Sequence, residues 1–221
     1  MLWSPTITCA NKGMENPAFP MLPRPQEPLD WTYSMRRDMQ EIIPGLFLGP
    51  YSSAMRSKVK CEQLSKAGIT HIVCIRQDVE ANFIRPNFPD KFLYLVLDIA
   101  DSQTSNIIQY IPQVKRFVDS CLLNGGRVLI HGNGGISRSA ALAIGYIMET
   151  YGLPYNQVFT FVQQKRFCIS PNEGFVSQLR EYEPIYRAKL TLERGETSHG
   201  AGKLKRRIEE VEDMDSWEAM S

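Results

Sequence analysis

The segment Val128–Ser139 constrains the fold more strongly than any other part of this chain. It consists of a short aliphatic strand, a loop with three glycines and the first residues of a helix. The helix that follows, over Ser139–Thr150, is small and apolar on almost every side. This composition predicts that it is buried at the centre of the fold and ends at Gly152. A strand joined to a buried helix in this way indicates an α/β architecture, in which helices pack on a sheet.

The alternation of strands and helices extends over residues 30–190. Short apolar runs predict strands at Ile42–Leu48, Ile69–Ile75, Phe92–Leu97 and Arg127–Ile130. Periodic apolar positions predict further helices over Asn106–Leu123, Pro154–Lys165 and Pro171–Lys189. We therefore expect a single α/β domain over residues 30–190, with a central sheet flanked by helices.

Both ends of the chain differ in composition from this domain. Residues 1–29 contain six of the fourteen prolines and no periodicity, which predicts a disordered leader; Met14 offers a second translation start within it. In residues 191–221, a basic cluster from Lys203 to Arg207 precedes a run of acidic residues. Such charge blocks predict a disordered tail, and the basic cluster is either a nuclear-import signal or an ordinary solvated charge run.

Composition excludes several classes of function. The 25 basic and 24 acidic residues give a formal net charge of +1, which argues against a nucleic-acid binder. No apolar run approaches the roughly 20 residues that span a bilayer, so no membrane association is expected. The five cysteines are scattered and the three histidines lie far apart, which predicts neither disulfides nor a metal site. We expect a protein of the cytoplasm and nucleus.

The glycine-rich loop has the composition of an anion site. Successive backbone N–H groups of such a loop can point inward, and the positive end of the following helix dipole adds to them. Arg138 stands at the helix start, where its planar guanidinium can bind two oxygens of one phosphate. The predicted phosphate-binding residues are Gly132, Asn133, Gly134, Gly135, Ile136, Ser137 and Arg138.

Other interpretations of the loop fit less well. A Walker A loop requires G-x-x-x-x-G-K-[ST], but Ser137 and Arg138 stand where glycine and lysine belong. A dinucleotide fingerprint could use Gly132 and Gly134, but Ser137 replaces its third glycine, and the loop follows several strands instead of opening the domain. A turn that merely needs flexible glycines remains an alternative.

The loop closely resembles the signature of the cysteine-dependent protein phosphatases, His-Cys-x5-Arg followed by Ser or Thr. His131, Arg138 and Ser139 match this pattern, and Gly135 matches a glycine of the family's loop, whereas Gly132 occupies the position of the nucleophilic cysteine. The runs Ile42–Gly49 and Ile169–Tyr182 resemble flanking motifs of the dual-specificity phosphatases, so the resemblance covers about residues 31–189. It implies the fold of that family, with a mixed central sheet between helices.

The resemblance also implies roles for single residues. Without a side chain, Gly132 cannot form the covalent cysteinyl-phosphate, so a catalytically inactive pseudophosphatase is expected. Asp101 is the expected counterpart of the general acid, ahead of Asp98, and a loop aspartate that only caps a helix is the alternative. His131 and Ser139 would support the loop. No cofactor is implied.

The expected partners are phosphorylated Ser/Thr/Tyr segments of signalling proteins, with MAP kinases suggested by the resemblance alone. Such a protein would anchor phosphoproteins or compete with active phosphatases. Two other functions stay open: a scaffold whose partners dock outside the pocket, and a weak phosphatase that uses water.

Overall fold

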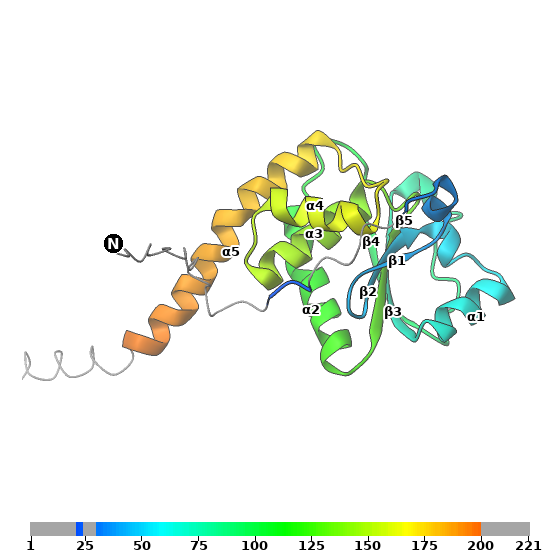
Figure 1. The fold of residues 1–221 in the computed structure, drawn as a ribbon, viewed down its shortest axis with the longest axis horizontal. Coiled ribbons are helices and arrows are strands. Elements are labelled where there is room, and N and C mark those ends of the chain that lie inside the picture. Colours follow the sequence, from blue (N-terminus) through cyan, green and yellow to red (C-terminus); the bar gives the residue numbers. More distant parts are fainter. Residues whose placement is uncertain (1–20, 24–29, 200–221) are drawn as a thin grey trace, which may run out of the picture.

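A mixed sheet of five strands organises the computed structural model, which describes residues 21–23 and 30–199 (Figure 1). The strands follow the order β1-β2-β5-β3-β4 across the sheet. Strand β1 pairs with β2 in antiparallel fashion, and the other neighbours are parallel. Their bounds are Gln40–Ile43 (β1), Leu46–Pro50 (β2), Ile69–Arg76 (β3), Leu93–Asp98 (β4) and Arg127–Gly132 (β5). This architecture confirms the expected fold class.

The predicted single strand Ile42–Leu48 was wrong, because the chain reverses direction inside it. Residues Pro44 and Gly45 form the turn between β1 and β2, and Gly45 has a φ of 83°. This left-handed conformation suits glycine, and proline ahead of it is common in such turns. The run thus supplies two antiparallel strands, and β2 lies beside β5.

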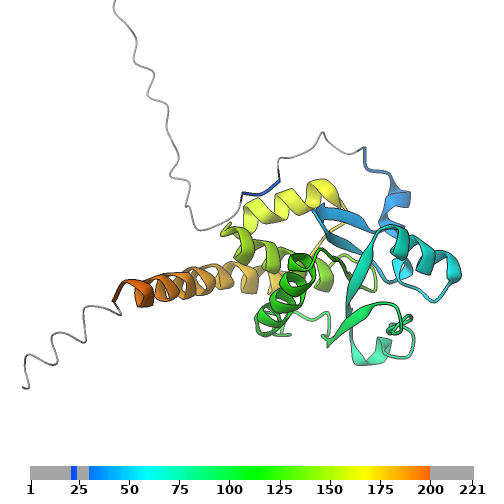
Figure 2. The ribbon, with the colours of Figure 1, turned by 90° about the horizontal axis from the view of Figure 1, so that it is seen from below.

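Helices cover both faces of the sheet, as Figures 1 and 2 show. Helix α1 lies alone on one face and was not predicted, since only Cys61 and Leu64 of its side chains are buried. The other four helices lie on the opposite face. The bounds are Lys58–Lys66 (α1), Ile111–Leu123 (α2), Arg138–Tyr151 (α3), Tyr155–Lys165 (α4) and Glu173–His199 (α5). Short 3-10 turns lie at Tyr33–Arg37, Tyr51–Ser53, Asp78–Glu80 and Ile108–Tyr110.

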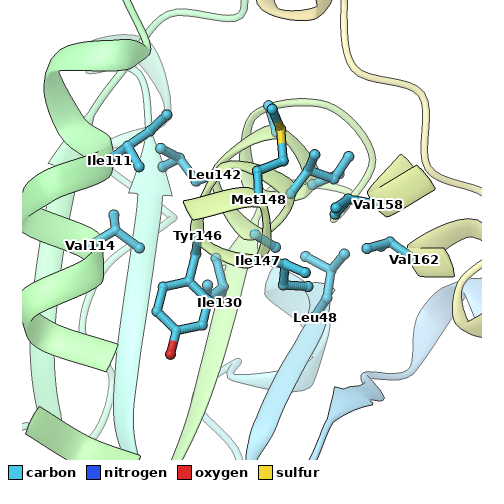
Figure 3. Close-up of a cluster of buried hydrophobic side chains, with 14 of the residues drawn as sticks. Leu48, Ile111, Val114, Ile130, Leu142, Tyr146, Ile147, Met148, Val158 and Val162 are labelled. Atoms are coloured by element: carbon cyan, nitrogen blue, oxygen red, sulfur yellow. The ribbon is translucent and has the colours of Figure 1, made fainter. Parts of the chain in front are cut away.

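Helix α3 is the centre of the larger core, as its composition predicted. All its side chains from Arg138 to Glu149 are buried, and the helix ends at Gly152, whose φ is 65°. Figure 3 shows aliphatic side chains of α3 packed between those of α2, α4 and the sheet. A smaller cluster fills the space between α1 and the other face of the sheet. The sheet and α3 thereby hold the ends of β5 and the loop after it in a fixed position.

Two boundaries differ from the sequence prediction. Helix α5 continues beyond residue 190 to His199, so the predicted disordered tail begins within a helix. Helix-forming residues such as Ala188, Lys189 and Leu192 favour this extension. Within the predicted leader, Leu22 packs against the main core. The rest of the leader up to residue 29 and the cluster Lys203–Arg207 lie outside the described residues.

The helix predicted from Asn106 begins with a 3-10 turn and becomes an α-helix at Ile111. The Asn106 side chain still accepts a hydrogen bond from the Gln109 amide at 3.3 Å. Within residues 21–23 and 30–199, none of the helices has the length and apolar character that a membrane crossing requires.

Candidate functional site

The glycine-rich loop lies between the end of β5 and the start of α3, at the carboxyl edge of the parallel strands. In open α/β sheets this edge is where ligands usually bind. A pocket of about 400 Å³ lies here. Its wall contains the predicted residues Asp101 and Gly132–Ser139, together with Arg36, which no sequence motif indicates. The structure therefore brings Asp101, from the loop after β4, next to the loop of β5.

The loop turns its carbonyl groups away from the pocket. The Asn133 carbonyl accepts a hydrogen bond from the Tyr51 amide at 3.0 Å, and the Ile136 carbonyl accepts one from the Ser170 amide at 2.9 Å. The Gly134 and Gly135 carbonyls accept from the Arg166 guanidinium at 3.0 and 2.9 Å. Because the N–H and C=O of a planar trans peptide point in opposite directions, the amides of the same peptides face the pocket. This is the geometry of an anion nest.

Gly135 is the one loop position where the backbone demands glycine. Its φ is 66°, and a Cβ atom there would lie 2.4 Å from the Gly49 carbonyl oxygen. A side chain would therefore push the loop off strand β2. The plain-turn interpretation accounts for this glycine but not for the inward amides of the whole loop.

The Arg138 guanidinium is buried and paired with Glu80. Its Nη1 and Nη2 atoms donate to the two carboxylate oxygens of Glu80 at 2.7 and 3.0 Å, and Nη1 also donates to the Ile99 carbonyl at 3.1 Å. Burial alone would raise the pKa of the Glu80 carboxyl, but hydrogen bonds from Arg138 and the Gln77 amide outweigh it and hold that pKa below its usual value.

This pairing leaves one edge of the guanidinium without a hydrogen bond among the described residues, although Asp101 forms a long ion pair with it. Arginine has five N–H donors in a planar fork. Glu80 and Ile99 occupy both donors of Nη1 and one of Nη2, so the edge formed by Nε and the second Nη2 donor remains. The Asp101 carboxylate lies 3.7 Å from Nε. Two oxygens of a phosphate fit such an edge.

Asp101 is held at the pocket by two hydrogen bonds. The Ser137 hydroxyl donates to its Oδ1 at 2.7 Å, and the Asn172 side-chain amide donates to the same oxygen at 2.8 Å. Asn172 also caps α5, because its Oδ1 accepts from the Phe175 amide at 3.0 Å. Asp98, the other candidate acid, instead pairs with Arg76 at 2.9 Å.

Gly132 leaves a space that a side chain could occupy. A Cβ built there would lie 3.4 Å from the Ser139 hydroxyl oxygen and 3.6 Å from the Ile75 carbonyl oxygen, which are ordinary contacts. The backbone of Gly132 is not in the left-handed region. The Ser139 hydroxyl is buried and has no hydrogen-bond partner within the part of the chain that the structure describes. The hydroxyl therefore faces the place where a longer residue 132 would supply one.

His131 is completely buried at the end of β5, beneath the loop. Burial lowers the pKa of its imidazole to about 4, against a smaller opposing effect of the Gly132 carbonyl, which lies 3.4 Å from Nδ1. The ring is thus neutral at pH 7. Its Nε2 has no partner among the residues described.

The buried side chain of Arg166 supports the loop, although no sequence motif indicates such a role. Its side chain is fully buried, at 0% exposure, and its hydrogen bonds go to uncharged oxygens. These are the carbonyls of Gly134, Gly135, Arg36 and Asp38 and the side-chain oxygen of Gln40. Among the described residues no ion pair includes Arg166, so its guanidinium adds positive charge beneath the anion nest.

The missed residues differ in the signal that the sequence offered. Asn172 lies inside the run Ile169–Tyr182 that carried the family resemblance, so a role could have been expected there. Glu80 and Arg36 are ordinary charged residues in short 3-10 turns, without a motif around them. Within residues 21–23 and 30–199, no cluster of three His, Cys, Asp or Glu side chains suits a metal ion.

Comparison with known proteins gives the same family that the loop and its flanking motifs indicate. The family described as the catalytic domain of dual specificity phosphatases matches residues 46–185. The chain is 64% identical over 175 residues to serine/threonine/tyrosine-interacting protein A of Xenopus laevis, which covers 79% of this chain and 78% of that protein. With the human serine/threonine/tyrosine-interacting protein it shares 58% identity over 207 residues, 89% of this chain and 92% of the relative.

Solved structures give the same result. The crystal structure of the human tyrosine phosphatase-like serine/threonine/tyrosine-interacting protein superposes with a TM-score of 0.66 at 64% identity, covering 68% of this chain and 98% of that one. Human DUSP28 superposes with a TM-score of 0.60 at 27% identity, covering 67% and 95%. The resemblance inferred from the loop and its flanking motifs is thereby confirmed.

Proposed function

Because the chain belongs to the dual-specificity phosphatase family, we propose that it is a catalytically inactive member that binds phosphorylated Ser, Thr or Tyr segments. One observation carries the proposal. The loop keeps its inward amides and the free edge of Arg138, while Gly132 puts no side chain at the strand end where the family has its nucleophile. Binding and catalysis are thus separated at one residue.

The absence of a thiolate favours phosphate binding. In the active family a thiolate faces the incoming phosphate dianion. Two like charges about 4 Å apart repel each other by several kcal/mol at an effective dielectric constant of 20. Glycine removes that repulsion and leaves the donors in place. The protein would hold a phosphorylated segment instead of hydrolysing it.

The ion pair between Arg138 and Glu80 favours the competing function, a scaffold whose partners dock outside the pocket. A guanidinium already bound to a carboxylate has less to offer a phosphate, and part of its charge is neutralised. The Nε edge of Arg138 and the charge of Arg166 weigh against this alternative. Water attack in a weak phosphatase has no observation in its favour.

The partners that we propose are phosphorylated signalling proteins, with MAP kinases suggested by the family alone. Anchoring such proteins, or shielding them from active phosphatases, would occur in the cytoplasm and nucleus. The function that we propose involves no nucleic acid, membrane, metal or cofactor.

The proposal is tested by equilibrium binding of the full-length protein to a synthetic phosphotyrosine peptide and to its unphosphorylated counterpart. A pocket binder prefers the phosphorylated peptide, and tungstate displaces it. Equal binding of both peptides would contradict the proposal and support the scaffold. Release of phosphate from an aryl phosphate, abolished by Arg138→Ala, would show an active phosphatase.

A further inference from the structure

The buried side chain of Arg166 connects the turn Tyr33–Arg37 to the glycine-rich loop. The Nη2 atom of Arg166 donates to the Gly134 carbonyl at 3.0 Å and to the Arg36 carbonyl at 3.1 Å. Its Nη1 atom donates to the Asp38 carbonyl at 2.8 Å. The backbone of the turn and that of the loop therefore share a single planar, buried connector. Such a connector fixes the position of Arg36 relative to the loop.

Arg36 lines the pocket and is exposed to solvent. Its guanidinium lies 5.9 Å from the centre of the Tyr33 ring, and its Nη1 donates to the Tyr33 hydroxyl at 3.4 Å. None of the ion pairs found within residues 21–23 and 30–199 includes Arg36. The side chain is therefore oriented by an aromatic ring while its charge stays available to a ligand.

A single phosphate does not need this additional cation. The loop amides and the free Nε edge of Arg138 already supply donors for its oxygens. The pocket has a volume of about 400 Å³. One liquid water takes up about 30 Å³, so a phosphate group of five heavy atoms fills only part of that space. The pocket that Arg36 helps to line therefore has room for a second group.

We propose that Arg36 binds a second anionic group of the same ligand, located next to the phosphorylated residue. The chemistry required is an oxyanion, either a carboxylate of a neighbouring Asp or Glu or a second phosphate. The inference rests on the proposed function and specifies its ligand as a segment with at least two neighbouring anionic side chains. Arg36 is then a specificity-determining residue, and the loop provides affinity for the first phosphate.

The experiment measures the affinities of three short synthetic peptides for the full-length protein by fluorescence anisotropy. Each peptide carries a central phosphotyrosine, flanked on both sides by alanine, by glutamate or by phosphoserine. Arg36→Gln should lower the affinity for the two peptides with anionic flanks by about fivefold, which is the upper end for a solvent-exposed ion pair. The alanine-flanked peptide should lose less than about twofold. Arg37→Gln is the matched control, since Arg37 is exposed on the same turn but does not line the pocket.

Each outcome discriminates between possibilities. A loss confined to the phosphoserine peptide identifies a second phosphate as the partner of Arg36, and a loss with both anionic peptides identifies oxyanions in general. An equal loss with all three peptides would assign Arg36 to the first phosphate and overturn the inference alone, as would no loss at all. If the wild-type protein binds none of the phosphopeptides, the proposed function fails and this inference fails with it.

Discussion

At the scale of single residues, the site lacks a side chain at residue 132 but keeps the hydrogen bonds and ion pairs around the loop. Gly132 has no side chain that could act as a nucleophile. The buried hydroxyl of Ser139, which has no hydrogen-bond partner among the described residues, still lies next to that position. Unsatisfied buried hydroxyls are costly and uncommon. Restoring a side chain at residue 132 would therefore fill a prepared space instead of creating strain.

We expect Gly132→Cys to hydrolyse a small aryl phosphate, whereas the wild type does not. The new thiol would lie at the amino end of α3 among inward amides, which lower the pKa of a thiol and populate the thiolate. Preorganised donors usually supply the largest part of a rate enhancement, and these are present. The measurement is release of the aryl alcohol by purified protein.

Two variants serve as controls for that gain. Gly132→Ala fills the same space without a nucleophile and should be inactive. Gly132→Cys combined with Asp101→Asn should turn over more slowly, because the amide cannot donate the proton that the leaving oxygen needs. A folded but inactive Gly132→Cys protein would mean that the loop has lost more than its thiol.

Arg138→Ala should weaken phosphopeptide binding by roughly 1.5 to 3 kcal/mol, the range for hydrogen bonds to charged groups. The substitution also leaves the Glu80 carboxylate buried without its partner, at 7% side-chain exposure. Breaking a buried pair on one side typically costs about 3 to 5 kcal/mol of stability.

The double variant Arg138→Ala with Glu80→Ala separates these two effects. It should recover part of the stability lost in Arg138→Ala, as measured by chemical denaturation, while phosphopeptide binding stays weak. Recovery of binding in the double variant would show that the Glu80 charge, and not the missing guanidinium, caused the loss.

At the scale of elements, the carboxyl edge of the sheet gathers loops that are distant in sequence. Helix α5 contributes directly through its cap residue Asn172. The Asn172 side chain donates a hydrogen bond to Asp101, and its backbone amide donates one to the Ser137 hydroxyl at 3.2 Å. In the first turn of α5, Gly174 lies against the loop that carries Asp101. A Cβ atom on Gly174 would lie 2.1 Å from the Gln103 carbonyl oxygen. The start of α5 thus sets the position of that loop.

We expect Gly174→Ala to lower the melting temperature, although alanine favours helices by about 0.5 to 1 kcal/mol over glycine. The added methyl group meets backbone atoms of Gln103 that cannot rotate away. Overpacking of this kind costs about 1 to 3 kcal/mol, and each kcal/mol corresponds to about 2 to 4 °C in a chain of this size. Circular dichroism melting measures it, with the exposed Ser177→Ala as control. An increase in melting temperature would contradict the packing described.

At the scale of the whole molecule, stability should depend on pH through His131. The pKa of its buried imidazole is about 4 in the folded chain, below the ordinary value of 6.5. Between these two pH values the unfolded chain binds a proton that the folded chain does not. The free energy of unfolding therefore falls as the pH drops from 6.5 toward 4, by roughly 2 to 3 kcal/mol from this group.

Urea denaturation at pH 7, 6 and 5 measures this dependence. His131→Gln should be less stable at pH 7 but should show a smaller loss between pH 7 and pH 5 than the wild type. An identical loss in both proteins would assign the pH dependence to other groups.

Local chemistry made much of this fold predictable from sequence. The aliphatic run of β5, the glycines after it and the all-round apolar surface of α3 each act through neighbours in the chain, so the strand, the loop and the buried helix followed from them. Elements with weaker local signals did not. Helix α1 buries too few side chains to show a periodic pattern. The apolar run Ile42–Leu48 looks like one strand by its hydrophobicity, but the turn at Pro44 and Gly45 divides it into two.

The sequence by itself determined that a glycine-rich loop precedes a buried helix, and that residue 132 has no side chain. Only the tertiary structure decided which distant residues complete the site. Glu80 pairs with Arg138, Arg166 connects the loop to the turn of Arg36, and Asn172 donates a hydrogen bond to Asp101. The physical reason is that a charged side chain in a loop has no periodicity to reveal its partner. The partner is set by which strand ends the sheet order brings together at one edge.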